Sequence, residues 1–221
     1  MADARTGEPR PKAVVFDMGG VLAPDCDYGE LLGGLDGAAA AAARQMISRQ
    51  WAAARCVPDF PMEDFFRPVL AAAGVPGDDW ARIDASVKAR FVPFWQVLGV
   101  VDRVRRAGYR VGIISNHLCS HFDSWMARYG LGDLFPEPDL VVVSSRARCA
   151  KPDPGIYRHF CERSGLSPQD CVFVDNKQAN VDAAVALGWR AFRFHHVSKD
   201  GRMKDHVDVL VGGLLTSGVA I

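Results

Sequence analysis

An aspartate stands directly after a short apolar run near the beginning of the chain. Residues 13–16 are all apolar, Asp17 follows them, and Gly19 and Gly20 come soon after. A short apolar run with β-branched residues predicts a buried parallel strand, and the glycines allow the chain to turn away from its end. At that edge of a sheet a carboxylate can act as a nucleophile or hold a metal ion. Asp17 is therefore a candidate catalytic residue, although a lone aspartate more often only begins a turn.

Three later apolar runs are each followed by polar residues of a distinct kind. These residues are Ser115 and Asn116 after 111–114, Lys151 after 140–143, and Asp175 and Asn176 after 171–174. Alone, each has a simpler explanation as a helix cap, a surface lysine or a turn. Together with Asp17 they provide two carboxylates, a fixed cation and a hydroxyl beside a helix N-terminus, a set that suits phosphoryl transfer assisted by a divalent metal. We therefore predict that they share one active site.

The order of elements predicts the fold class. The four apolar runs and a fifth candidate strand at 191–194 alternate with helical patterns at 100–107, 117–129, 154–164 and 181–187, each of which ends at a glycine. Such alternation predicts an α/β fold with a Rossmann-like, doubly wound parallel sheet.

Residues 23–92 interrupt this alternation. The segment is rich in alanine, a strong helix former, and contains no convincing strand. We predict a small α-helical cap, inserted after the first strand and lying over the carboxyl edge of the sheet as a lid. The Rossmann-like core would then comprise residues 12–22 and 93–221, and the polar residues 1–11 would form a flexible N-terminal tail.

Composition excludes several classes of protein. The chain has 221 residues, with 26 Lys and Arg against 26 Asp and Glu, and 49% of its residues are hydrophobic. The balanced charge gives no general reason to bind nucleic acid or an anionic membrane, and no apolar stretch is long enough to span a bilayer. Six scattered cysteines without a Cys-x-x-Cys pair favour a reducing, cytoplasmic location. We expect no nucleic-acid or membrane partner and a monomer or homodimer.

The motifs together resemble those of the haloacid dehalogenase-like (HAD) hydrolase superfamily, in the branch with a helical cap after the first motif. The matching segments are Phe-Asp-Met-Gly-Gly-Val at 16–21, Ile-Ser-Asn at 114–116, Lys-Pro-Asp-Pro-Gly-Ile-Tyr at 151–157 and Phe-Val-Asp-Asn at 173–176. The likeness extends from about residue 12 to residue 194, and the lysine segment is its most specific part. The Asp-x-Gly-Gly-Val motif is similar to that of sugar-phosphate phosphatases in this branch.

The resemblance implies a Mg²⁺-dependent phosphatase that acts on a small phosphorylated metabolite. Asp17 would attack phosphorus and form an aspartyl-phosphate, which water then hydrolyses. The implied catalytic residues are Asp17, Ser115 and Lys151, the implied substrate contacts are Gly19, Gly20, Asn116 and His117, and the implied Mg²⁺ ligands are Asp17, the Gly19 carbonyl, Asp175 and Asn176.

Two residues depart from the family pattern. Gly19 stands where most phosphatases of the superfamily have a second aspartate, which protonates the leaving group and later activates water. Loss of such a group typically costs about 10²–10⁴-fold in rate. His117, Asp25 and Asp27 are candidates to replace it, and the sequence does not choose among them. Asn176 stands where the family has a second acid, and because an amide brings no charge we expect weaker Mg²⁺ binding than at a two-acid site.

Both departures also suit the dehalogenases of the superfamily, which attack carbon with their aspartate and need no metal. Their pattern places an arginine early in the cap, for which Arg44, Arg49 and Arg55 are candidates, although the solvated face of an alanine-rich helix explains these residues more simply. A phosphonate-cleaving enzyme would need a cap lysine, and only Lys88, late in the insert, is present. The remaining alternative is a catalytically weak or dead member that binds a phosphorylated ligand or a protein, against which the intact motifs argue.

Overall fold

A computed structural model describes residues 10–25, 37–196 and 204–221 of the chain. In these residues, five parallel strands form one sheet in the order β3-β2-β1-β4-β5. The strands are β1 (Ala13–Phe16), β2 (Arg110–Ser115), β3 (Val141–Val143), β4 (Cys171–Asp175) and β5 (Arg190–Arg193). All five lie within one residue of the predicted positions, and the predicted Rossmann-like parallel fold is confirmed.

The register brings the ends of the central strands to one edge of the sheet. Phe16 of β1 lies opposite Ile113 of β2 and Val174 of β4. The Asp17 N–H continues this ladder by donating to the Val174 carbonyl (2.8 Å). Because all strands run parallel, Asp17 and the residues that end β2 and β4 must lie close together.

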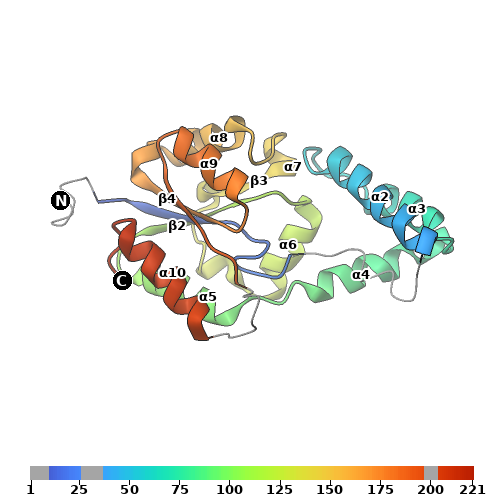
Figure 1. Cartoon of the computed structure of the whole chain (residues 1–221), viewed down its shortest axis with the longest axis horizontal. Helices are drawn as coiled ribbons and strands as arrows, with labels where there is room; N and C mark the ends of the chain where they lie inside the picture. Colours follow the sequence, from blue (N-terminus) through green and yellow to red (C-terminus); the bar gives the residue numbers. More distant parts are fainter. Residues whose placement is uncertain (1–9, 26–36, 197–203) are drawn as a thin grey trace.

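Helices cover both faces of the sheet (Figure 1). They are α5 (Trp95–Arg106), α6 (Cys119–Arg128), α7 (Ser144–Ala147), α8 (Pro154–Ser164), α9 (Gln178–Ala186) and α10 (Lys204–Thr216), with short 3₁₀ turns at Leu131–Asp133, Pro138–Leu140 and Pro168–Asp170. Side chains alternate along β1, so that Val14 and Phe16 enter one apolar cluster and Ala13 and Val15 enter the other. The sheet is therefore buried on both sides.

The segment between β1 and β2 is helical, and Figure 1 shows it at one end of the molecule. It contains α2 (Gly37–Ala54), α3 (Met62–Ala72), a 3₁₀ turn (Gly77–Asp79) and α4 (Trp80–Arg90). Helix α3 packs against both α2 and α4, and Phe65 and Phe66 are buried between them. We refer to α2–α4 as the helical insert. Its predicted extent as a separate cap, 23–92, stays a prediction.

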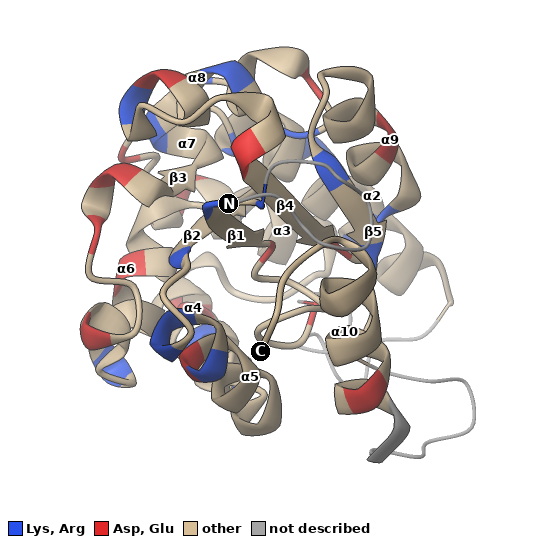
Figure 2. Cartoon of the chain, turned by 90° about the vertical axis from the view of Figure 1, so that its left-hand side faces the viewer, with Lys and Arg blue, Asp and Glu red and all other residues tan. Residues whose placement is uncertain are grey.

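Figure 2 shows that segments with Lys or Arg and segments with Asp or Glu are interspersed along the helices. Among the helices in the described parts of the chain, none has both the length and the apolar character required to cross a bilayer.

Candidate active site

The chain reverses direction immediately after Asp17. The Met18 carbonyl accepts the N–H of Ala23 (2.9 Å), and the Gly20 N–H donates to the Ala23 carbonyl (2.7 Å). Gly20 has a φ of +75°, and a Cβ there would lie 2.2 Å from Asn176 Nδ2. Only glycine fits both the left-handed backbone and this close approach. The loop leaves the Asp17 side chain at the edge of the sheet with little exposed surface.

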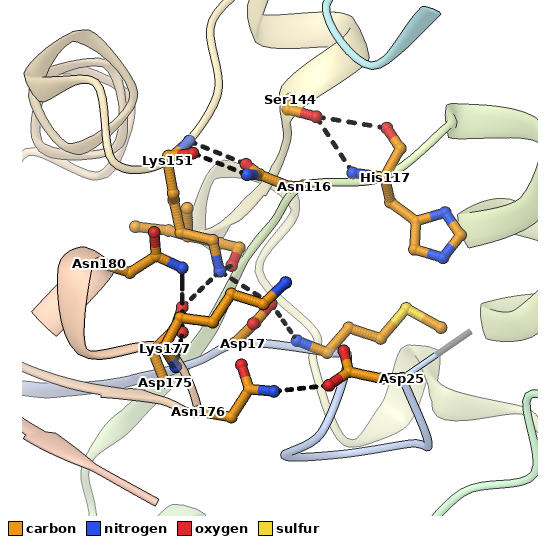
Figure 3. A network of polar contacts seen from close by, with 12 residues as sticks. Asp17, Asp25, Asn116, His117, Ser144, Lys151, Asp175, Asn176, Lys177 and Asn180 are labelled. Atoms are coloured by element: carbon orange, nitrogen blue, oxygen red, sulfur yellow. Dashed lines mark hydrogen bonds and ion pairs between the residues drawn. The ribbon is translucent and has the colours of Figure 1, made fainter. Parts of the chain in front are cut away.

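Lys151 holds two carboxylates at this edge (Figure 3). Its Nζ is 2.8 Å from Asp17 Oδ1 and 2.7 Å from Asp175 Oδ2, and it also donates to the Ile114 carbonyl (2.7 Å). The Asn116 side chain fixes the backbone of Lys151, because its Nδ2 donates to the Lys151 carbonyl and its Oδ1 accepts the Lys151 N–H, both at 2.8 Å. Lys151 is thus held both at its backbone and at its ammonium group.

Asp175 is fully buried and its oxygens are saturated with hydrogen bonds. Besides Lys151, it accepts from Asn180 Nδ2 at 3.0 Å to each oxygen and from the Lys177 N–H at 2.8 Å. Asn180 is itself held, since its carbonyl accepts the Tyr157 hydroxyl (2.8 Å). Asp175 therefore serves as an anchor for Lys151 and has no oxygen free for a further ligand.

The buried cluster has more negative than positive charge, because two carboxylates share one ammonium. Burial raises the pKa of Asp17 to about 7; the charge of Lys151 opposes this shift and that of Asp175 adds to it. Burial alone would lower the pKa of Lys151, but the two carboxylates raise it above its ordinary value. Lys151 thus stays protonated, and an additional cation near Asp17 would be stabilised.

A cavity of about 470 Å³ opens above Asp17, between the strand ends and the helical insert. Of the predicted site residues, those that line it are Asp17, Gly19, Asn116, His117 and Lys151. The predicted site residues that are not part of its lining are Ser115, Gly20, Asp175 and Asn176. Ser115 is buried at the last position of β2, paired with Val143, whereas Gly20, Asp175 and Asn176 support the residues that do line the cavity.

His117 is buried in the cavity wall as a neutral ring. Burial lowers its pKa to about 3, and its Nδ1 lies 3.2 Å from the Leu118 carbonyl, which places the ring proton on Nδ1. Its backbone N–H donates to Ser144 Oγ (3.0 Å), and α6 begins at Cys119, two residues later than predicted. A neutral ring whose proton points at a carbonyl has no proton to give to a leaving group.

The sequence analysis did not identify several residues of the site. Lys177 lines the cavity, and its charge opposes the rise that burial causes in the pKa of Asp17; its position two residues after Asp175 was an available signal. Phe91, at the end of α4, also lines the cavity, and Ser144 links His117 to the Arg55 carbonyl (2.6 Å) of the insert. No sequence motif marks Phe91 or Ser144, because their roles depend on how the insert lies on the sheet.

Oxygen ligands suitable for a divalent cation are present beside Asp17. No group of three His, Cys, Asp or Glu side chains in the described residues forms a metal site, so such an ion has to use neutral oxygens as well. The Asn176 Oδ1 atom is buried and accepts no hydrogen bond from the described residues, and Asp17 Oδ2 accepts none from them either. These two oxygens fit Mg²⁺, which prefers carboxylate and carbonyl ligands.

This chain belongs to the haloacid dehalogenase-like hydrolase family, whose model matches residues 11–188. The phosphatase MT3486 of Mycobacterium tuberculosis is 30% identical over 131 residues, which cover 59% of this chain and 57% of that protein. The (S)-2-haloacid dehalogenase 1 of Pseudomonas sp. (strain CBS-3) is 26% identical over 104 residues, or 46% and 44% of the two chains. The chain therefore spans about half the length of these curated relatives.

Solved structures confirm the fold. The HAD family enzyme bt-2542 of Bacteroides thetaiotaomicron superposes with a TM-score of 0.70 at 20% identity, covering 86% of this chain and 97% of that one. The protein is thus a HAD-like hydrolase with phosphatase and dehalogenase relatives.

Proposed function

We propose that this protein is a Mg²⁺-dependent phosphatase that hydrolyses a small phosphorylated metabolite through an aspartyl-phosphate on Asp17. The observation that carries the proposal is the Asp17 carboxylate at the bottom of the cavity. Its Oδ1 is held by Lys151 (2.8 Å) and by the Met18 N–H (2.7 Å), which fixes the orientation of the carboxylate. A nucleophile fixed by one oxygen is oriented before the substrate arrives.

The surrounding residues would carry the rest of the chemistry. Lys151 would stabilise negative charge on the nucleophile and on the transferring phosphoryl group. Lys177 and Arg55 add cationic side chains to the cavity wall, which attract a phosphate dianion. Asp175 and Asn116 act through Lys151 by fixing its two ends, and Ser115 remains a predicted phosphate contact.

Mg²⁺ would be held by Asp17, the Gly19 carbonyl and Asn176 Oδ1, and when bound would offset the excess negative charge of the buried cluster. Asp175 was also predicted as a ligand, but its saturated oxygens favour a role in holding Lys151. The bt-2542 enzyme has been solved with magnesium and inorganic phosphate, which supports the choice of metal. With one neutral ligand in place of an acid, we expect Mg²⁺ affinity weaker than low micromolar.

Hydrolysis of an aryl phosphate tests this function. The wild type and Asp17→Asn would be compared with Mg²⁺ and with a chelator. We expect turnover that needs Mg²⁺ and is lost in the variant. Equal rates in the two proteins, or turnover unaffected by chelation, would contradict the proposal.

A 2-haloacid dehalogenase is the second candidate, and one observation favours it. Of the three arginines considered for holding a substrate carboxylate, Arg55 lines the cavity, whereas Arg44 and Arg49 are exposed and do not. Halide release from 2-chloropropionate in the presence of a chelator, lost in both Asp17→Asn and Arg55→Ala, would select this reaction. Phosphatase turnover without halide release would exclude it.

The cysteines in the described residues, Cys56, Cys119, Cys149, Cys161 and Cys171, are free thiols. This supports a reducing, cytoplasmic setting. A monomer or homodimer without nucleic-acid or membrane partners remains our expectation.

A further inference from the structure

We propose that Asp25 is the general acid and base of this active site and replaces the side chain that Gly19 lacks. The inference rests on the proposed phosphatase function, which lacks a group to protonate the leaving oxygen and to activate water. The structure locates one carboxylate where such a group is needed.

The loop after β1 brings Asp25 back beside Gly19. A parallel bridge pairs Gly19 with Ala23, and the Gly20 N–H donates to the Ala23 carbonyl (2.7 Å), so that the loop closes with Ala23 beside Gly19. Asp25 Oδ1 then lies 2.8 Å from the point that a Cβ on Gly19 would occupy. Any side chain at position 19 would collide with this carboxylate. Glycine at 19 therefore makes room for an acid supplied from position 25.

The second departure from the family pattern serves the same carboxylate. Asn176 Nδ2 donates to Asp25 Oδ2 at 2.7 Å (Figure 3). An aspartate at 176 would instead place a second carboxylate against Asp25. Gly19 and Asn176 thus form a matched pair, in which one residue gives Asp25 space and the other gives it a hydrogen bond. Oδ1 accepts no hydrogen bond from the described residues, so this oxygen is left to exchange a proton with the substrate.

The other candidates are less suitable. His117 is a neutral ring whose proton points at a backbone carbonyl, and Asp27 lies outside the described residues. Among the described residues that line the cavity, Asp17 and Asp25 are the carboxylates, and Asp17 is the proposed nucleophile. Asp25 is therefore the acid that the cavity itself provides.

The proton balance of the reaction follows directly. As Asp17 forms its bond to phosphorus, the ester P–O bond breaks and Asp25 gives its proton to the leaving oxygen, which releases the alcohol. Asp25, now ionised, takes a proton from a water molecule that attacks phosphorus. The Asp17–phosphorus bond then breaks, phosphate leaves, and both carboxyl groups return to their starting states.

Asp25→Asn separates these two steps when it is tested on two substrates. An aryl phosphate has a good leaving group that needs no proton, whereas an alkyl phosphate needs one. With the aryl phosphate we expect Asp25→Asn to release a burst of phenol equal to the enzyme, and then to turn over about 10²–10⁴-fold more slowly than the wild type. With the alkyl phosphate we expect the same loss and no burst. Because the Asp25 side chain is 50% exposed, the midpoint of unfolding should not change.

A control variant and the other possible results distinguish a failure of the role of Asp25 from a failure of the phosphatase function. Asp64→Asn, at an exposed position in α3 away from the cavity, is the matched control and should behave as the wild type. Unchanged turnover in Asp25→Asn, or loss of the aryl burst as in Asp17→Asn, would overturn the role of Asp25 while leaving the phosphatase intact. A wild type without turnover on either substrate would overturn both. In addition, adding Gly19→Asp to the Asp25→Ala variant should raise its turnover at least tenfold, since a carboxylate returns to the same space.

Discussion

Around Asp17, the strand ends supply buried polar side chains that hold one another, and Lys151 alone contacts two carboxylates and a carbonyl. The opposite wall of the cavity is different. It comes from α2 and the end of α4 and presents Ile47, Trp51 and Phe91, together with the cationic Arg55. The first wall is fixed by hydrogen bonds, whereas the second is mostly apolar.

We infer from this difference that the strand ends carry out the chemistry, whereas the helical insert selects the substrate. The fixed wall orients a nucleophile and a cation, which any phosphate ester would use in the same way. The apolar wall can contact only the part of the substrate that differs between esters. We therefore expect variants of the strand ends to affect every substrate alike, and variants of the insert to affect substrates differently.

The largest effect is expected from Lys151→Met. Removing the ammonium leaves two buried carboxylates without their shared cation, which typically costs about 3–5 kcal/mol of unfolding free energy. Urea unfolding and aryl phosphate turnover would measure the loss of stability and of activity. Lys12→Met is the matched control, because Lys12 is 65% exposed and pairs with Asp170 at the surface, and it should change neither quantity. A fully stable Lys151→Met protein would show that the strand ends do not depend on this cation.

An intermediate effect is expected where the helical insert contacts the core, between α4 and α6. Asp84 of α4 accepts hydrogen bonds from His121 Nε2 of α6 and from Lys88 Nζ, both at 2.6 Å. Burial alone would raise the pKa of Asp84, but these hydrogen bonds lower it overall. A lowered pKa means that the carboxylate stabilises the fold above its unfolded value of about 3.9 and loses this effect as the pH falls through the folded value.

Asp84→Asn should therefore lower the unfolding free energy by about 1.5–3 kcal/mol at pH 7. The difference from the wild type should shrink as the pH falls below the unfolded pKa of about 3.9, and it should be lost once the pH has passed the lowered folded pKa of Asp84. Urea unfolding over a pH series measures this. Asp78→Asn, whose side chain is 94% exposed, should leave stability unchanged. A loss that is equal at pH 3 and pH 7 would mean that charge at Asp84 does not join the insert to the sheet.

The smallest effect is expected from Arg55→Ala. Its guanidinium lies in the cavity wall and attracts an anionic substrate through partly screened charge, so KM should rise by about fivefold or less with kcat unchanged. High salt should remove the difference. Arg44→Ala provides the comparison, because Arg44 lies in α2, the helix that directly precedes Arg55, but does not line the cavity. An equal rise in KM for Arg44→Ala would assign the effect to net charge.

The sequence was most informative about the sheet. Buried parallel strands are continuous apolar runs, so their ends could be located to within one residue, and Asp17 and Lys151 were identified there. Asn116 was predicted as a substrate contact and lines the cavity; the sequence did not indicate that its side chain also holds the backbone of Lys151. Ser115 was placed at the site but is enclosed at the end of β2. Which way a side chain points at a strand end depends on the following loop, which periodicity does not describe.

The cavity residues that come from the loop after β1 and from the helical insert were harder to predict. The sequence offered Asp25, Asp27 and His117 as replacements for the acid missing at Gly19. The choice of Asp25 required the hydrogen bonds of the loop and the position of Asn176, 151 residues later. Phe91 and Arg55 line the cavity because of the way the insert packs, and side-chain contacts between distant segments leave no local pattern.

The central claim is that Asp17 becomes phosphorylated. The most direct test is to mix the protein with an aryl phosphate and Mg²⁺, quench with acid within the first turnover, and measure the mass of the intact chain and of its peptides. We expect a mass increase of one phosphoryl group on the peptide that contains Asp17, absent from Asp17→Asn. An unmodified chain during active turnover, or a phosphoryl group on another residue, would contradict the account.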